Sequence, residues 1–451
     1  MLLQMVKLFV RAFFVYFLKT RMPPAGRGFG SVPMATEGKR RAGMEKRVLI
    51  VTTTHEFLLK FEGENVGLLQ RMGYTVHYAT NMEEPRYVSQ GEQLRQMGVV
   101  THHIAIARSP FRLRDNYKAL IQLLELIRRY RFQVIHCHTP VGGLLGRLAG
   151  RLCRDSRPFV IYTAHGFHFY KGAPLWNRLV YHGAEKLLAR WTDALLVINE
   201  EDYRAARHFR LRRGGALYKI PGAGLDRERF HPVSEEERKQ GRAELGMDEG
   251  VFFLLSVGEL NENKNHGVVL DALARLREEG EPLSDFRYGI CGDGFLRRRL
   301  EERIRELKLE KVVTLYGYCD HVPRILGCAD AAVFPSRREG LGMAGLEALA
   351  MGVPLIAADN RGTREYMEQG ENGFLCRYDD PEGFARAIRQ ARRMSARQRT
   401  AMRARCIDSV RPFDRAYTTA MMERIYAVAA DGRGWHTHEQ TGKSQRHYGR
   451  I

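Results

Sequence analysis

Two carboxylates with a fixed spacing are the residues of this 451-residue chain with the clearest chemical meaning. Glu339 and Glu347 are eight positions apart in SRREGLGMAGLEALAMGVP, where a glycine-rich loop leads into an apolar helical pattern. An ionised carboxylate accepts hydrogen bonds, so we expect Glu339, before the helix, to meet sugar hydroxyls and Glu347, inside it, to meet a ribose. The pair by itself also fits a solvated helix face or a charge complementing the helix dipole.

The loop between the carboxylates suits a diphosphate. Gly340 and Gly342 have no side chains, so backbone N–H groups can approach a ligand closely. The amides of Leu341, Gly342 and Met343 open the helix, where partial positive charge favours an anion. The segment therefore predicts a nucleotide-sugar site.

Four further segments carry a family resemblance. They are SVGELNENKNH with Gly258 and Lys264, YGICGDGFLRRRL with Gly292, HCHTP at 136–140 and YTAHGFHFYKGAP at 162–174. With the two glutamates, these segments follow the order found in retaining GT-B glycosyltransferases of family 4, and the first-half motifs resemble bacterial capsular and exopolysaccharide transferases. The resemblance covers about residues 46 to 430, and five ordered matches are far more specific than any single one.

The resemblance implies transfer of a hexose or N-acetylhexosamine from a nucleotide-diphosphate sugar, expected to be a UDP-sugar, with retention. It assigns His165, Lys264 and Glu339 to catalysis, and Gly258, Gly292 and Glu347 to nucleotide-sugar binding beside the loop above. Lys264 would neutralise the leaving diphosphate. No D-x-D pair is present, so neither a metal nor another cofactor is expected.

One residue departs from the family pattern. Many members place an arginine directly after the glycine that ends the first strand of the second domain, whereas this chain has Glu259. Either Glu259 orients Lys264, or Arg337 or Arg338 supplies the missing cation. The substitution also leaves open a non-catalytic homologue.

Histidines dominate the expected acceptor side. We expect His55, His138 and His168 to contact the acceptor, although His168 could equally pack beside its aromatic neighbours. His136 and His138 flank Cys137, and we expect them to point to opposite faces, with His136 hydrogen-bonded in the core. The histidine pairs are poor metal candidates because no carboxylate or cysteine completes a set at sensible spacing.

Alternating strand and helix patterns predict an α/β protein with the GT-B fold: two Rossmann-like, doubly wound parallel-sheet domains facing a cleft. In the second domain these patterns include a strand near 286–291, a helix near 264–279 that begins with Lys264, and a helix near 381–393. We expect a basic and apolar extension and linker at 1–43, an acceptor-binding domain at 44–225 and a nucleotide-sugar-binding domain at 226–410. A C-terminal helix at 411–430 should pack back on the first domain, followed by a disordered tail at 431–451.

Charge points to a membrane surface and away from nucleic acid. The net charge is +20, of which residues 1–47 contribute 10 − 2 = +8 and residues 433–451 contribute 4 − 1 = +3. No nucleic-acid motif accompanies it, so we expect no nucleic-acid partner. Residues 1–20 resemble an interfacial amphipathic helix, unless translation starts at Met34 or Met44. The basic and apolar residues at 108–118 either dock on a membrane or form an ordinary amphipathic helix.

These features predict a cytoplasmic enzyme on the inner face of the plasma membrane, acting on a polyprenyl-diphosphate-linked sugar or a glycan in surface polysaccharide biosynthesis. Seven cysteines without a C-x-x-C pair fit a reducing compartment. An epimerase or phosphorylase on the same fold and a non-catalytic nucleotide-sugar-binding scaffold are the alternatives.

Overall fold

The computed structural model describes residues 45–83, 91–153, 155–170 and 172–431. The expected N-terminal extension at 1–43 and the tail after residue 431 lie outside the described residues. Contacts divide the chain into two compact units. Unit 1 contains residues up to Val197, Asp202–Lys219 and the chain from Thr419 onward, and unit 2 contains Ile198–Glu201 and Ile220–Thr418.

Unit 1 is built on a seven-stranded parallel sheet in the order β3-β2-β1-β4-β5-β6-β7. The inner strands of this sheet are buried on both sides, which is typical of a parallel sheet covered by helices, whereas the edge strands β3 and β7 are more exposed. The chain moves outward from β1 to β3, then returns to place β4 beside β1. The strands are β1 (Lys46–Val51), β2 (Tyr74–Thr80), β3 (Val100–His103), β4 (Val134–His138), β5 (Phe159–Ala164), β6 (Ala194–Val197) and β7 (Ala216–Lys219).

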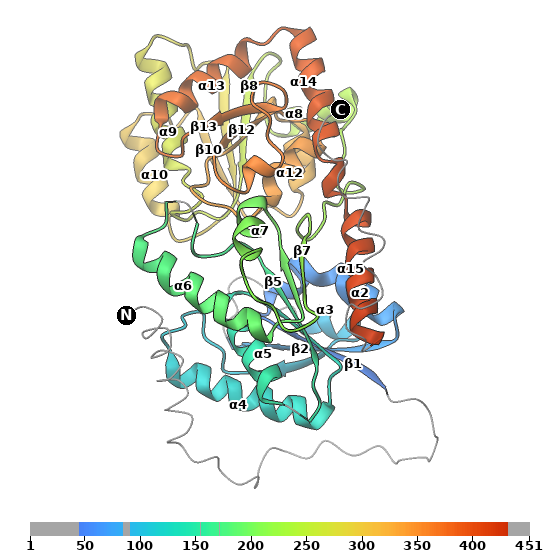
Figure 1. The fold of residues 1–451 in the computed structure, drawn as a ribbon. Coiled ribbons are helices and arrows are strands. Elements are labelled where there is room, and N and C mark those ends of the chain that lie inside the picture. Colours follow the sequence, from blue (N-terminus) through green and yellow to red (C-terminus); the bar gives the residue numbers. More distant parts are fainter. Residues whose placement is uncertain (1–44, 84–90, 154, 171, 432–451) are drawn as a thin grey trace. The chain divides into compact units, whose positions relative to one another are not determined.

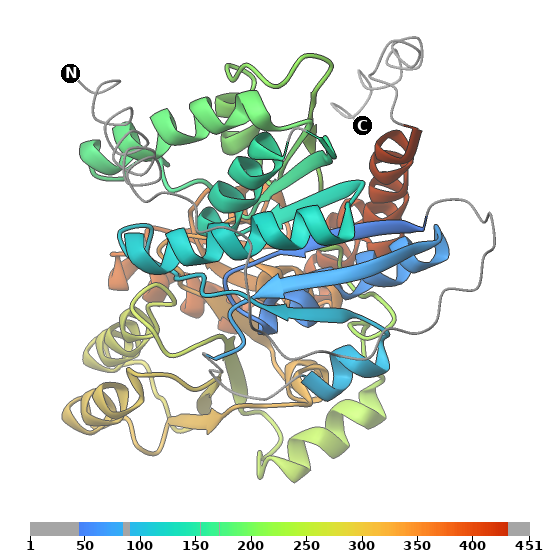
Figure 2. The ribbon, with the colours of Figure 1, turned by 90° about the horizontal axis from the view of Figure 1, so that it is seen from below.

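The two faces of this sheet differ in character. One face packs an apolar core with the helices α4 and α5, and it includes Leu49, Ile135 and Cys137 from the strands. The opposite face carries His136, whose Nδ1 lies 2.8 Å from the hydroxyl of Tyr426. The helical segments of unit 1 are η1, a short π-helix (Leu58–Glu62), α2 (Gly63–Arg71), α3 (Gly91–Gln96), α4 (Leu113–Tyr130), α5 (Pro140–Leu152), α6 (Leu175–Leu188), η2 (Ala189–Trp191) and α7 (Glu200–Ala206), with α7 beginning in unit 2 (Figure 2).

Unit 2 repeats the plan with a six-stranded parallel sheet in the order β10-β9-β8-β11-β12-β13. Its strands are β8 (Phe252–Val257), β9 (Phe286–Cys291), β10 (Val313–Gly317), β11 (Ala331–Phe334), β12 (Leu355–Ala358) and β13 (Gly373–Cys376). Its helical segments are α8 (Glu235–Glu244), α9 (Gly267–Glu278), α10 (Arg297–Glu306), α11 (Val322–Gly327), α12 (Met343–Ala350), η3 (Thr363–Glu365), α13 (Pro381–Arg393), α14 (Ala396–Ser409) and η4 (Arg411–Phe413) (Figure 1).

The last helix, α15 (Arg415–Asp431), begins in unit 2 and joins unit 1 from Thr419 onward. Its Tyr426 is fully buried against the sheet of unit 1 through the contact with His136. The expectation that the C-terminal helix packs back on the first domain is therefore confirmed.

The expected α/β class is confirmed, with differences in detail. The strand at 286–291 and the helix at 381–393 have the predicted bounds, whereas α9 begins at Gly267 and not at residue 264. The sequence pattern did not reveal β7 or β13, because each has only four residues and lies at a sheet edge, without a long apolar run.

Two simple observations bear on the environment of the chain. All seven cysteines are free thiols, as expected. Among the residues that the structure describes, no helix combines the length and apolar character needed to cross a membrane.

Candidate functional site

The site in unit 2 lies where the strand order reverses. The chain leaves β8 toward β9 and β10, then returns to β11 on the other side of β8. The loops that follow β8 and β11 therefore diverge at the carboxyl edge of the sheet, which is where open α/β sheets bind ligands. Lys264 lies in the first loop and Glu339 in the second.

Lys264 and Glu339 form an ion pair across this point. Lys264 Nζ donates to Glu339 Oε1 at 2.8 Å, and the two side chains are only 22% and 15% exposed. The ammonium also lies 4.9 Å from the centre of the Phe334 ring at the end of β11. An ammonium has three donors, so one bond to Glu339 leaves two for phosphate oxygens. The structure brings together the two residues predicted to act on the diphosphate and the sugar.

Lys264 is held in a loop and not in a helix, contrary to expectation. Its backbone N–H donates to Asn261 Oδ1 at 2.9 Å, and the next residue, Asn265, adopts a left-handed φ of 57°. This turn delays the helix until Gly267. A Cβ on Gly258 would lie 3.3 Å from Lys264 Cδ, so the glycine leaves room for the lysine side chain.

Two glycines are required by close packing. A Cβ on Gly292 would lie 1.9 Å from the carbonyl oxygen of Gly258, which no side chain can tolerate. Gly342 has φ of 89°, and a Cβ there would meet the Phe334 ring at 2.7 Å. These positions keep the ends of β8, β9 and β11 close together, as a backbone-lined site requires.

The glycine-rich turn delivers backbone amides to the start of α12. Leu341 is buried and Met343 is the first residue of the helix, so the amides of Leu341, Gly342 and Met343 stand at its amino end. The carbonyl of Gly340 accepts a hydrogen bond from Asn199 Nδ2 at 2.9 Å. The first amides of a helix have no acceptor within the helix, so they can bind an anion.

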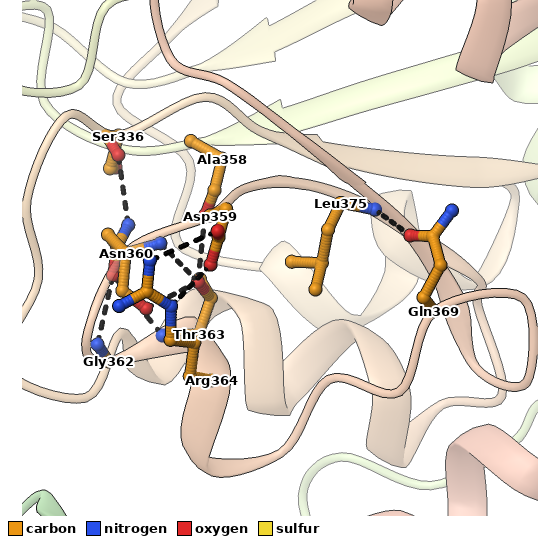
Figure 3. A network of polar contacts seen from close by, with 9 residues as sticks. All are labelled: Ser336, Ala358, Asp359, Asn360, Gly362, Thr363, Arg364, Gln369 and Leu375. Atoms are coloured by element: carbon orange, nitrogen blue, oxygen red, sulfur yellow. Dashed lines mark hydrogen bonds and ion pairs between the residues drawn. The ribbon is translucent and has the colours of Figure 1, made fainter.

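A second turn braces the loop that carries Glu339 (Figure 3). Asn360 Nδ2 donates to the carbonyl of Ser336 at 3.0 Å, and Asn360 Oδ1 accepts from the amides of Gly362 and Thr363 at 3.0 and 3.2 Å. A Cβ on Gly362 would lie 2.9 Å from Glu339 Cβ. The turn therefore packs directly on Glu339 and restricts where its carboxylate can point.

Glu365, the last residue of η3, accepts a hydrogen bond from the backbone N–H of Glu200 at 2.5 Å. Glu200 is the first residue of α7, so Glu365 caps the start of that helix. This contact favours the structural role for Glu365.

Glu347 lies in the helix that follows, partly buried and close to two cations. Burial raises the pKa of Glu347 to about 7, and the charges of Arg229 and Lys264 oppose that rise. Near neutral pH the group can therefore be either an acceptor or a donor of hydrogen bonds. Arg229 was not among the predicted site residues, because it lies in the connecting segment after unit 1, far from Glu347 in the sequence.

The structure pairs Lys264 with Glu339, while the role of Glu259 stays a prediction. The loop of Arg337 is tied to the lysine loop, since the Arg337 N–H donates to the carbonyl of Asn263 at 2.8 Å and its Nε to Asn265 Oδ1 at 3.4 Å. Arg337 is thus placed close to the lysine loop, as compensation for Glu259 would require.

Unit 1 has a second polar centre at its own strand-order reversal, between β1 and β4. His138 ends β4, His165 follows β5, and Glu62 ends the π-helix η1 that follows β1. His138 Nδ1 lies 3.1 Å from His165 Nε2 and 3.4 Å from Glu62 Oε1. Burial raises the pKa of Glu62 to about 8 and lowers the pKa of His165 to about 4. The group is therefore uncharged at neutral pH.

The expected orientation of His136 and His138 is wrong. Both side chains are fully buried, and their ring centres are 4.1 Å apart on one face of β4. Side chains alternate along a strand, so residues two apart share a face. His136 is nevertheless hydrogen-bonded in the core, as expected, through Tyr426 and through Thr163 Oγ1 at 2.8 Å.

The two other histidines predicted to contact the acceptor, His55 and His168, make structural contacts in unit 1. His55 is buried, and its carbonyl accepts from the Tyr78 hydroxyl at 3.1 Å. The His168 ring packs 5.1 Å from the ring of Tyr181 in α6, which favours the packing role. Their contacts with an acceptor stay predictions.

Sequence reasoning missed Glu62. The premise that no carboxylate completes a histidine set is wrong, because ligand atoms of Glu62, His138 and His165 all lie within 4.8 Å of one another. Glu62 sits in a segment that reads as an amphipathic helix, and only the fold shows that its side chain is buried. The wider turn of a π-helix, often found at functional sites, precedes it and could not be read from the residues.

Comparison with known proteins gives consistent matches to both units. Residues 237–410 match the family described as glycosyl transferases group 1, and residues 66–216 match glycosyltransferase family 4. Over 348 residues the chain is 40% identical to EpsD of Bacillus subtilis (strain 168), a protein named as a glycosyltransferase. The match covers 77% of this chain and 87% of that protein.

Two further similarities are informative. The chain is 30% identical over 272 residues to an Escherichia coli protein named UDP-Gal:alpha-D-GlcNAc-diphosphoundecaprenol alpha-1,3-galactosyltransferase, covering 60% of this chain and 69% of that protein. The crystal structure of Anabaena Alr3699/HepE in complex with UDP-glucose superposes with a TM-score of 0.67 at 17% identity, covering 85% of this chain and 99% of that one.

Proposed function

Because the chain belongs to the family 4 glycosyltransferases and has the GT-B fold, we propose that it transfers a hexose or N-acetylhexosamine from a UDP-sugar, with retention. The proposed acceptor is a lipid-linked sugar or glycan in bacterial surface polysaccharide biosynthesis. The 2.8 Å pair of Lys264 and Glu339 at the strand-order reversal of unit 2 is the observation that carries the proposal.

The uridine nucleotide and the lipid-linked acceptor rest on the relatives. The Anabaena structure is titled as a complex with UDP-glucose, and the Escherichia coli relative is named for a UDP-galactose donor and a diphosphoundecaprenol acceptor. We carry both chemical classes to this chain as proposals, without choosing the sugar.

Contacts in unit 2 support the roles proposed for Lys264 and Glu339. Lys264 and the amides that open α12 would neutralise the negative charge that develops on the departing diphosphate. Glu339, braced by the turn at Asn360, would accept from donor-sugar hydroxyls. Glu347 would accept from the ribose. His165 would contact the donor sugar or stabilise the reacting centre.

A panel of UDP-sugars tests the proposal on the full chain. We expect one UDP-sugar to raise the unfolding temperature, since a ligand at 100 times its dissociation constant adds about 2.7 kcal/mol. We also expect release of UDP only when a lipid-linked acceptor is added. Equal release without acceptor would point to an epimerase or hydrolytic activity, and binding without any turnover would point to a scaffold.

We further propose that unit 1 docks on the inner face of the plasma membrane through the start of α6. Leu175, Trp176 and Leu179 are 74%, 52% and 45% exposed on its first turns, beside the exposed Arg178. An exposed tryptophan and leucines next to a cation suit the boundary between acyl chains and anionic head groups. In the segment 108–118, Phe111 and Leu113 are also exposed, while Asn116 is buried.

Vesicle flotation tests the docking surface. Trp176→Ser combined with Leu179→Ser should reduce binding of the full chain to anionic phospholipid vesicles by about 10-fold or more, since each lost apolar side chain removes about 1–2 kcal/mol. Tyr417→Ser is the matched control, because Tyr417 is 56% exposed in unit 2. Equal flotation of the double variant and the wild type would refute docking through α6.

A further inference from the structure

Three potential metal-ligand atoms in unit 1 lie within 4.8 Å of one another. His138 Nδ1 is 3.1 Å from His165 Nε2 and 3.4 Å from Glu62 Oε1. Both neighbours therefore meet the same nitrogen of His138. A proton relay would enter an imidazole at one nitrogen and leave at the other, which this arrangement does not do. Three potential ligand atoms within 4.8 Å of one another are instead an arrangement that suits a cation.

We propose that Glu62, His138 and His165 form a binding site for a divalent transition metal of the zinc class. Two imidazoles and one carboxylate are a ligand set that zinc accepts, with a fourth position left for water or another oxygen ligand. Ligand distances of about 2.0–2.1 Å place tetrahedral ligand atoms about 3.3–3.4 Å apart, close to the two separations observed here. The inference needs only the geometry of unit 1 and does not rest on the proposed transferase activity.

The surroundings of the three side chains support a fixed site. Glu62 Oε2 accepts from Asn65 Nδ2 at 2.7 Å, which leaves Oε1 facing His138. The Phe57 ring packs 5.3 Å from the His138 ring and 5.0 Å from the His165 ring. Second contacts of this kind orient metal ligands and restrict solvent. His165 is half-buried, so the site can be reached from its side.

Titration of the metal-free full chain with zinc chloride, and with cobalt chloride for its visible absorption, tests the site. We expect one ion per chain and the absorption of tetrahedral cobalt. Glu62→Gln, His138→Gln and His165→Gln should each weaken binding by about 10–100-fold or more, the effect seen even for outer contacts of metal sites. If the buried variants fail to fold, the half-buried His165→Gln still decides the question, with circular dichroism as the check on folding.

Two controls locate the metal. His77 Nδ1 and His102 Nε2 form another histidine pair at 2.9 Å. Among the described residues, no carboxylate or cysteine joins this pair to make a three-ligand group. His102→Gln should therefore bind as the wild type does. Replacing the tail histidines His436, His438 and His447 by Gln should also leave binding intact. The proposal is overturned if zinc fails to bind, if the three ligand variants bind normally, or if either control abolishes binding.

Discussion

Removal of the Lys264 ammonium is the most direct perturbation of the proposed transferase. Lys264→Ala deletes the cation that lies 2.8 Å from Glu339 and leaves that carboxylate, only 15% exposed, without this partner. The lysine side chain lies beside Gly258, where an added Cβ would be 3.3 Å from Lys264 Cδ. Truncation of the lysine therefore leaves space and does not force a rearrangement. The variant therefore isolates the charge.

The expected loss of rate can be placed on a scale. Deleting one preorganised group that stabilises developing charge costs about 100-fold to 1,000-fold in kcat, or about 2.7–4 kcal/mol. A partly buried acceptor left without its partner also costs about 1–3 kcal/mol of folding stability. Activity must therefore be compared well below the unfolding midpoint of the variant, with Lys264→Arg as the charge-preserving version.

The assay is acceptor-dependent UDP release with the donor that stabilises the chain best. Arg299→Ala is the matched control, because Arg299 forms a 3.1 Å pair with Glu262 in the same unit but is 74% exposed. We expect that control to stay within about 3-fold of the wild type, since exposed pairs contribute about 0–1 kcal/mol. A folded Lys264→Ala variant that also stays within about 3-fold would refute the assigned role.

Three further predictions concern buried charge. UDP binding should tighten by up to about 10-fold from pH 6 to 8, because Glu347, whose pKa is raised to about 7, becomes a strong acceptor for the ribose when it ionises. Calorimetry should find this dependence absent in Glu347→Gln. Glu62 has its pKa raised from 4.5 to about 8, so the folded state holds its proton longer and stability should fall as pH rises through that window, by at most about 1.4 kcal/mol per pH unit. Chemical unfolding of Glu62→Gln should lack this component, and an unchanged slope would contradict the burial argument. Arg147→Met should lower the free energy of unfolding by about 3–5 kcal/mol, because Arg147 is fully buried and its partner Glu185, 2.7 Å away, would lose its counter-charge. The control Arg298→Met, at an exposed ion pair, should change the free energy of unfolding by less than about 1 kcal/mol.

Local patterns were sufficient where the chain has strong periodicity or a glycine with a fixed task. The strand at 286–291 and the helix at 381–393 could be read from apolar spacing and from the proline and acidic residue at the helix start. Gly342 could be named because close backbone approach favours glycine, and Gly292 because its segment resembles the family motif; the structure gives the clashes that require glycine at both positions. The edge strands β7 and β13 could not be read, since neither carries a long apolar run.

The sequence by itself determined the family, the alternation of strands and helices, and the residues that meet at the carboxyl edge of the second sheet. These properties depend on short-range spacing, and parallel strands bring the ends of neighbouring loops together whatever lies between them. Only the tertiary structure showed that Lys264 pairs with Glu339, that Arg229 acts on Glu347, and that Glu62 joins two histidines. Burial and electrostatic environment are set by which distant segments pack together, and that information is not contained in any one segment.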